Sequence, residues 1–266
     1  MILYKYVSLE SGIKILEGNS IGFSEPQDFN DPFETAARDK AKESGLNPVF
    51  SSLNNCRNPW ARNVAVLSLT RQPKNKLMLA HYSDNHKGMV IGFDLSKIQD
   101  FLSEEFCYIP AQYGSVIYTD TMPTFNPQED DSANWEVCSY EIRQRALLHK
   151  DITWSMEEEV RIALILRDYE TRFDVIQIDD RPLYLFKLPE DAICEVYLGP
   201  RAEILPAKFG NYETWVKLSS LLNARAGCTP YQLVIDDNSW NIEAERLRTN
   251  VYDGYWELHH DRLKCD

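Results

Sequence analysis

Four apolar runs follow one another without a helical stretch between them in the second half of the chain. They cover residues 158–166, 173–178, 183–188 and 193–198, and each is short enough for a single β-strand. Strict alternation of strands and helices would predict a parallel sheet, whereas consecutive strands are typical of antiparallel pairing. We therefore expect an α+β fold, in which helices pack on one or more mixed, largely antiparallel sheets.

The length of 266 residues suits one large domain or two small ones. A Pro- and Asp-rich loop at 121–134 divides the chain, but neither side of it holds an obviously complete sheet. We therefore predict a single domain over 1–266, with 205–266 as a helical C-terminal appendage. One helix face in that appendage is apolar and could dock on the domain, on a partner protein or on a second copy of the chain; it carries Trp215, Val216, Leu218, Leu221 and Leu222.

Charge and cysteine usage exclude several classes of protein. Lys and Arg number 28 and Asp and Glu number 41, so the net charge is −13, which argues against a nonspecific nucleic-acid binder. The six cysteines are scattered and form no C-x-x-C pair, a pattern that favours reduced thiols over a zinc site or a disulfide framework. Because no apolar run is long enough to cross a membrane and no leader pattern is present, we expect a cytoplasmic protein.

An acidic cluster stands directly before the first of the four apolar runs. If the strand already includes Glu157 and Glu159, their side chains point to one face and Glu158 points to the other. Two neighbouring carboxylates repel, so one can have a raised pKa and act as an acid or base. Arg161 is then the internal partner of the two carboxylates. The alternative is a solvated strand entry, partly paired with Arg161.

A histidine and a tyrosine end the helical pattern near residue 80. His81 could serve as a base and Tyr82 as a stacking platform for a ring. Alternatively, His81 only complements the dipole at a helix C-terminus. The separation of His81 from His86 does not suit two ligands on one helix face, so we predict no metal site.

The loop at Phe29-Asn30-Asp31-Pro32-Phe33 has two readings. The Asn30 and Asp31 side chains can fix the turn before Pro32, or they can contact a ligand in a cleft. The two phenylalanines are expected to anchor the loop in the core.

Four motifs, taken in order, resemble a bacterial family known as domain of unknown function 2971. Leu79 and Val160 stand where that family usually carries Trp, so aromatic stacking is lost at both positions. The family name implies no activity. The motifs are Leu3–Tyr6 followed by Phe23–Pro26 and Phe29–Glu34, then Met78–Gly88 leading into Ile91–Phe93, then Trp154 with Glu157, Glu159 and Arg161, and finally Glu195–Arg201.

The chain is also similar in outline to ADP-ribosyltransferases, which are small α+β enzymes that bind NAD in a cleft. Arginine-type members place a basic or polar residue on one strand, a Ser-x-Ser/Thr segment on a second and Glu-x-Glu at the start of a later one. This resemblance implies a Glu that hydrogen-bonds a ribose hydroxyl and stabilises an oxocarbenium-like transition state. The implied catalytic residues are Glu159, Glu157 and His81, and the implied NAD-binding residues are Lys5, Tyr6, Ser68, Thr70, Tyr82, Asn30, Asp31 and Arg161.

Three functions therefore compete. The first is an ADP-ribosyltransferase-like enzyme or NAD glycohydrolase that acts as a toxin, effector or antiphage protein on an unknown protein or nucleic-acid target. The second is a non-catalytic nucleotide-sensing or protein-interaction module of a bacterial defence system. The third is a metal-dependent nuclease, against which the acidic charge and the lack of a paired ligand motif count. Convergence of Tyr6, Ser68, His81 and Glu159 on one cleft would favour the first.

Overall fold

The chain divides into two compact units. The computed structural model describes residues 1–31, 33, 38–39, 64–125, 140–166, 173–202, 212–249 and 256–257. The first unit comprises Met1–Ile21, Leu69–Gln99 and Lys187–Asp266, and the second comprises Gly22–Ser68 and Asp100–Phe186. The boundary falls inside strands β2 (Ser20–Ser24) and β4 (Val64–Thr70). No helix in these ranges is long and apolar enough to cross a membrane.

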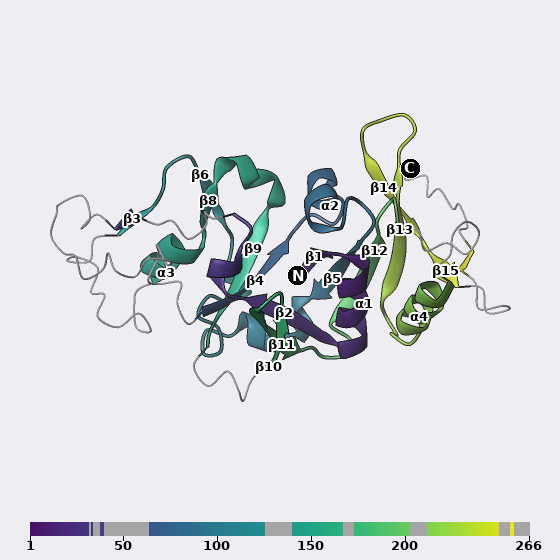
Figure 1. Ribbon diagram of the computed structural model, residues 1–266, viewed down its shortest axis with the longest axis horizontal. Coiled ribbons are helices and arrows are strands. Elements are labelled where there is room, and N and C mark those ends of the chain that lie inside the picture. Colours follow the sequence, from purple (N-terminus) through teal and green to yellow (C-terminus); the bar gives the residue numbers. More distant parts are fainter. Residues whose placement is uncertain are drawn as a thin grey trace. The chain divides into compact units, whose positions relative to one another are not determined.

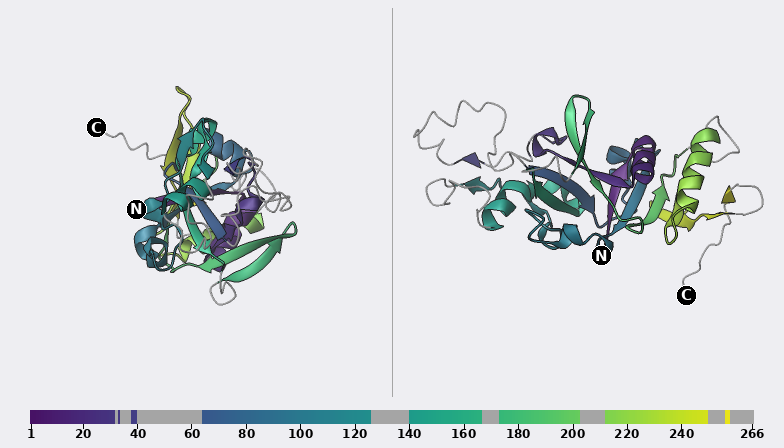
Figure 2. Two further views of the ribbon diagram at one scale, coloured as in Figure 1. Left: turned by 90° about the vertical axis from the view of Figure 1, so that its left-hand side faces the viewer. Right: turned by 90° about the horizontal axis from the view of Figure 1, so that it is seen from below.

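The first unit is a sheet with helices packed on it (Figure 1). Its strand order is β4-β1-β5-β12-β13-β14, and these pairings are antiparallel except for the parallel pair of β12 and β13. Figure 2 shows helices α1 and α4 beside one another in the view from below. The main elements are β1 (Ile2–Val7), α1 (Leu9–Gly18), α2 (Lys76–Tyr82), β5 (Met89–Asp94), β12 (Ile193–Leu198), α4 (Tyr212–Asn223), β13 (Thr229–Ile235), β14 (Ile242–Arg246), β15 (Arg248–Thr249) and β16 (Trp256–Glu257).

Helix α1 shows how the sequence sets element ends in this unit. The Ser8 side chain accepts a hydrogen bond from the Ser11 amide at 3.1 Å, which caps the first turn. At the other end Asn19 adopts the left-handed conformation, with φ of 45°, and stops the helix. Ile13 and Leu16 are buried, so one face of α1 packs inward.

The second unit is built from short strands around a compact core. Strands β10, β11, β2 and β4 follow one another, and β9 pairs with β4. Its elements are η1 (Pro26–Asp28), β3 (Arg38–Asp39), η6 (Ala111–Tyr113), β6 (Ile117–Thr119), β7 (Thr124–Phe125), α3 (Tyr140–Leu147), β8 (His149–Asp151), η7 (Ile152–Glu157), β9 (Glu159–Ile165), β10 (Asp174–Ile178) and β11 (Arg181–Lys187), where η denotes a 3₁₀ helix.

The expected α+β class is confirmed, because the sheet is largely antiparallel and the helices are few. The four apolar runs form β9, β10, β11 and β12, but only β10 and β11 pair with each other as neighbours in sequence. Strand β12 pairs instead with β5 and, through the crossover helix α4, with β13 in parallel. Residues 205–266, where a helical appendage is predicted, thus hold α4 together with strands β13 to β16.

A close backbone approach holds β9 against the segment before β6. The Arg161 amide donates to the Gly114 carbonyl at 2.8 Å, and the Val116 amide donates to the Glu159 carbonyl at 3.0 Å. A Cβ atom on Gly114 would lie 1.9 Å from the Arg161 carbonyl oxygen. Only glycine therefore allows the two segments to approach so closely.

We expect Gly114→Ala to lower the free energy of unfolding by about 1–3 kcal/mol or more, because the added methyl group forces two paired backbones apart. Urea denaturation measures this change. The matched control is Ser115→Ala at the next, exposed position, which should stay within about 0.5 kcal/mol of wild type. Equal stabilities of the two variants would contradict the packing argument.

Candidate functional site

A cavity of about 600 Å³ opens in the second unit. This volume lies in the range of small-molecule binding sites. The wall comes from the loop after η1, from the turn between β6 and β7, and from the segment that runs from the end of α3 through β8 into η7. The lining residues are Asn30, Asp31, Phe33, Thr119, Asp120, Thr121, Met122, Pro123, Arg145, His149, Lys150, Asp151, Thr153 and Trp154.

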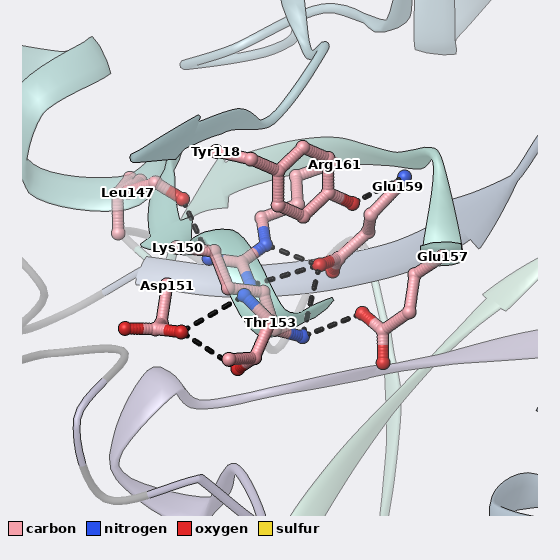
Figure 3. A network of polar contacts seen from close by, with 8 residues as sticks. All are labelled: Tyr118, Leu147, Lys150, Asp151, Thr153, Glu157, Glu159 and Arg161. Atoms are coloured by element: carbon pink, nitrogen blue, oxygen red, sulfur yellow. Dashed lines mark hydrogen bonds and ion pairs between the residues drawn. The ribbon is translucent and has the colours of Figure 1, made fainter. Parts of the chain in front are cut away.

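One wall residue, Lys150, leads from the pocket into a buried network of charges (Figure 3). Its Nζ donates to Glu157 Oε2 at 2.6 Å and contacts Glu159 Oε2 at 3.3 Å. Arg161 donates from Nε to Glu159 Oε1 at 2.8 Å and from Nη2 to Glu159 Oε2 at 3.0 Å. The four side chains are 2–7% exposed. Two carboxylates thus face two cations in the interior, and the formal charges cancel.

The chain brings Glu157 and Glu159 together through a sharp backbone turn. Glu157 ends η7, Glu158 adopts the left-handed conformation with φ of 43°, and β9 begins at Glu159. The sequence suggested that strand alternation places the two side chains on one face. This explanation is wrong, because Glu157 precedes the strand. Glu158 is exposed, as expected. The alternative of a solvated strand entry is wrong for the other two, which are buried.

The pKa of Glu159 is lowered, whereas the sequence suggested a raised pKa for one of the two carboxyl groups. Burial alone would raise the pKa of this carboxyl group. The charges of Arg161 and Lys150, with hydrogen bonds from Arg161 and Ser68, outweigh burial and lower the pKa from 4.5 to about 2. Glu159 is thus an ionised partner of two cations. The expectation that Arg161 pairs with the carboxylates is confirmed at Glu159.

Further contacts fix the network in place. The Tyr118 hydroxyl accepts a hydrogen bond from the Glu159 amide at 2.8 Å, and burial raises the pKa of this phenol to about 12. Asp151 caps η7 by accepting from the Thr153 amide at 2.9 Å and from the Thr153 hydroxyl at 2.6 Å. Arg161 also donates to the Leu147 carbonyl at 2.7 Å. The cluster thus holds four elements in contact with one another: α3, β8, η7 and β9.

Two aromatic rings lie against the cations. Lys150 Nζ is 5.1 Å from the centre of the Trp154 ring, and the Arg161 guanidinium is 5.2 Å from the centre of the Phe29 ring. Both distances suit cation–π attraction. Because Trp154 also lines the cavity, its ring connects the pocket with the charged network.

The predicted site residues fall into two groups, one in each unit. The second unit contains Ser68, Asn30, Asp31, Glu157, Glu159 and Arg161, and the first contains Lys5, Tyr6, Thr70, His81 and Tyr82. In the second unit the structure joins Ser68, Glu159 and Arg161 directly, and Glu157 through Lys150.

The Asn30–Asp31 loop combines both of its expected roles. Asp31 Oδ1 accepts a hydrogen bond from the Phe33 amide at 2.9 Å and so fixes the turn, while Asn30 and Asp31 also line the cavity. Phe29 packs on the core as expected. Phe33 is 62% exposed and lies on the pocket wall, so its expected role as a core anchor is wrong. Pro32 and Glu34 lie outside the described residues.

Two candidates of the first unit, Tyr6 and Thr70, make hydrogen bonds to nearby backbone groups. The Tyr6 hydroxyl donates to the Gln72 carbonyl at 2.6 Å and accepts from the Asn75 amide at 2.8 Å. Thr70 Oγ1 accepts from the Gln72 amide at 3.0 Å. Tyr6 and Thr70 thereby fasten the connection between β4 and α2, since both of their hydroxyl groups contact its backbone.

The other three first-unit candidates differ in exposure. His81 is exposed, and its ring centre is 6.2 Å from that of Tyr82. Tyr82 packs against the core cluster of this unit. Lys5 is half-buried on β1.

Lys150 belongs to the candidate site but is not singled out by the sequence. It lies on the three-residue strand β8, which contains no recognised motif. One signal was present, because two buried carboxylates need more than one cation and Arg161 supplies only one charge. Searching the flanking sequence for a second cation leads to Lys150, seven positions before Glu157.

The geometry defines an α+β protein with a cavity of about 600 Å³ beside a charge-neutral buried network. Residues 78–162 match the model of a family described as a protein of unknown function, DUF2971. The resemblance found in the sequence is thereby confirmed over this stretch, which includes Lys150, Glu157, Glu159 and Arg161. No curated protein and no solved structure matches the chain.

The depressed pKa of Glu159 predicts a defined pH dependence. A carboxyl group whose pKa is lowered on folding stabilises the protein above its unfolded pKa, and this contribution is lost as the pH falls through the folded value. With values of 4.5 and about 2, the loss falls between these two. We therefore expect wild type to exceed Glu159→Gln in unfolding free energy at neutral pH, and the difference to shrink steadily below about pH 5.

Urea denaturation of both proteins at a series of pH values measures this difference. Glu158→Gln, which removes the same charge at an exposed position, is the matched control and should show little change with pH. A difference between wild type and Glu159→Gln that stays constant between pH 5 and the acid limit of folding would overturn the assignment of an ionised, paired Glu159.

Proposed function

We propose that the second unit binds a planar, polar ligand of nucleoside size in its cavity without covalent catalysis. The observation that carries this proposal is the Trp154 ring, which lines a cavity of about 600 Å³ and lies against the ammonium group of Lys150. A tryptophan ring on a cavity wall offers a stacking surface to a base or a similar ring.

The polar groups of the wall support a ligand with many hydrogen-bonding groups. Two threonines, Thr119 and Thr121, line the cavity with Asn30 and Asp31. Such groups pair with ribose hydroxyls and base edges. The ring of Trp154 suits the planar base of a nucleoside, and these polar groups suit its hydrogen-bonding groups.

The charges of the wall argue against a ligand recognised mainly through phosphate. Among the wall residues that the structure describes, Asp31, Asp120 and Asp151 stand beside two permanent cations, Lys150 and Arg145. Lys150 is committed to Glu157 and Glu159, and Arg145 forms an ion pair with Glu141. Because these cations are already compensated, the wall offers little attraction to a phosphate group.

The catalytic role implied for Glu159 is not what the geometry favours. Both of its carboxylate oxygens already accept hydrogen bonds from cations, whereas the implied role needs one of them to accept from a ribose hydroxyl. A binding function therefore accounts for the pocket and the network without requiring the network to open.

We expect Trp154→Ala to weaken ligand binding about tenfold or more, because stacking on an aromatic ring is lost. A panel of adenosine, guanosine, cytidine, uridine, ATP and NAD is screened by thermal shift, and dissociation constants of the hits come from calorimetry. Trp154→Phe, which keeps a ring, should retain most of the affinity. Trp240→Ala, at a position that is 90% exposed in the first unit, should bind as wild type does.

Two outcomes would contradict the proposal. One is a wild-type protein that no compound of the panel stabilises or binds. The other is a Trp154→Ala variant that folds normally and binds a hit as tightly as wild type. A preference for ATP over adenosine would contradict the inference that phosphate contributes little.

A second candidate is the NAD-consuming enzyme implied by the resemblance to ADP-ribosyltransferases. One observation favours it, namely that Ser68 on β4 hydrogen-bonds Glu159 on the neighbouring strand β9. The three aspartates of the wall would also suit the positively charged nicotinamide ring. In this case Glu159 must give up a hydrogen bond from one of its cations and accept one from a ribose hydroxyl. The enzyme would then act as an effector, toxin or antiphage protein on a protein or nucleic-acid target.

For this candidate we expect wild type and Glu158→Gln to release nicotinamide from NAD, and Glu159→Gln to lose the activity while keeping its fold. Chromatography of the reaction and circular dichroism of each variant provide the measurements. Absence of release by wild type, or equal release by Glu159→Gln, removes the candidate. The acidic net charge of −13 counts against the third possibility, a metal-dependent nuclease.

A further inference from the structure

A carboxylate that accepts hydrogen bonds from two tyrosine hydroxyl groups lies on the sheet of the first unit. Tyr4 on β1 and Glu195 on β12 are both paired with Gly92 on the intervening strand β5, so their side chains project from the same face. Tyr197 on β12 is paired with Tyr231 on β13 in the next row of that face. We call Tyr4, Glu195, Tyr197 and Tyr231 the tyrosine cage.

The side chains of the tyrosine cage contact one another closely. The hydroxyl groups of Tyr4 and Tyr197 both donate to Glu195 Oε2, each at 2.9 Å. The rings of Tyr197 and Tyr231 stack with centres 4.6 Å apart, and the ring of Tyr4 meets that of Tyr197 edge-on at 6.1 Å. These contacts orient three rings and one carboxylate on a rigid sheet.

Gly92 allows this arrangement. A Cβ atom at Gly92 would lie 2.9 Å from Tyr4 Cε1 and 3.1 Å from Glu195 Cβ. The absence of a side chain on β5 lets the Tyr4 ring reach across to the carboxylate.

The carboxylate of Glu195 has donors but no counter-charge within the part of the chain that the structure describes. Its partners there are the two phenols, and no Lys, Arg or His forms an ion pair with it. Both phenols use Oε2, which leaves Oε1 for another partner. Arg246 on β14 is opposite Tyr231 and therefore lies one strand further from Glu195. Glu195 is half-buried, and a carboxylate in that position is stabilised by a cation.

Two phenols and two thiols near Glu195 are neutral. Burial, together with the hydrogen bonds to Glu195, raises the pKa of Tyr4 and of Tyr197. Burial also raises the pKa of Cys194 to about 11 and that of Cys228 to about 12. At neutral pH these phenols and thiols are protonated, so the negative charge of Glu195 is not shared with any of them.

We propose that the tyrosine cage binds an alkylated ammonium group. A soft organic cation is attracted to the electron-rich faces of aromatic rings, and a quaternary ammonium ion is held in this way by several rings. Glu195, held by two of the tyrosine hydroxyl groups, supplies the opposite charge. A small inorganic cation would gain the charge attraction but little from the rings, since it keeps its water shell.

The experiment uses the whole chain and tetramethylammonium chloride as the probe. Saturation-transfer NMR of the probe's methyl protons gives the dissociation constant, with sodium chloride added to hold ionic strength constant. We expect saturable binding to wild type, and about tenfold or more weaker binding to Glu195→Gln. The glutamine oxygen can still accept from both phenols, so this variant should fold. Glu190→Gln removes the same charge at an exposed position of the first unit and should bind as wild type does.

A second variant, Tyr231→Leu, tests the rings independently of the charge and should also weaken binding. Dissociation constants for choline and for a peptide that carries trimethyllysine are then compared. The compound that binds more tightly shows whether the natural ligand is a small choline-like molecule or a methylated protein. No saturable binding to wild type, unchanged binding to folded Glu195→Gln, or displacement of the probe by an equal concentration of sodium would overturn the proposal. None of these results depends on ligand binding to the cavity of the second unit.

Discussion

Two carboxylates and two cations are held together in the second unit with almost no access to water. Each of these charges alone would be strongly unfavourable in the interior. Glu159 remains ionised because Arg161, two residues along the same strand, and Lys150, from a different strand, both reach it. The elements that carry the four charges, with the α3 residue Leu147, must therefore occupy fixed relative positions. The wall of the cavity depends on this arrangement, because Lys150 and Trp154 belong to it.

Fixed charges have a consequence for function. A residue that takes part in proton transfer needs a pKa close to the working pH, whereas Glu159 is held far below it. What the network does well is to place Trp154 and the polar groups around it in a constant geometry, which favours affinity by limiting the freedom that binding must remove. The tyrosine cage of the first unit uses a different principle, since its carboxylate is oriented by phenols and forms no ion pair with any residue that the structure describes.

The sequence predicts the elements of this protein better than it predicts their partners. Apolar runs and capping residues identify β9 to β12 and helix α1 because these signals are local. The pairing of β12 with β5 involves residues about a hundred positions apart, and no local pattern encodes that choice. At the site, residue spacing singled out Glu157 and Glu159 correctly as a pair, but for the wrong reason, because a left-handed residue and not strand alternation brings them together.

The electrostatic environment was harder to predict than the positions. Repulsion between the two glutamates suggested a raised pKa, and the cation that reverses this effect, Lys150, lies in no motif. Phe33 shows the same limit for apolar residues, since its type suggests a core position while the backbone of the Asp31 turn directs it to the pocket. Whether a side chain is paired or buried depends on segments that are distant in sequence. Local sequence patterns carry no information about these segments.

The four-charge network also restricts how the protein can change over time. Replacing any one member by a neutral residue leaves an odd charge in the interior, at a cost of about 3–5 kcal/mol. That is a large part of the about 5–15 kcal/mol by which a typical domain is stable. A descendant of this chain can therefore lose Lys150 readily only together with a carboxylate. Lineages in which the cluster has changed should have exchanged a cation and an anion jointly, and intermediates with only one change should be rare.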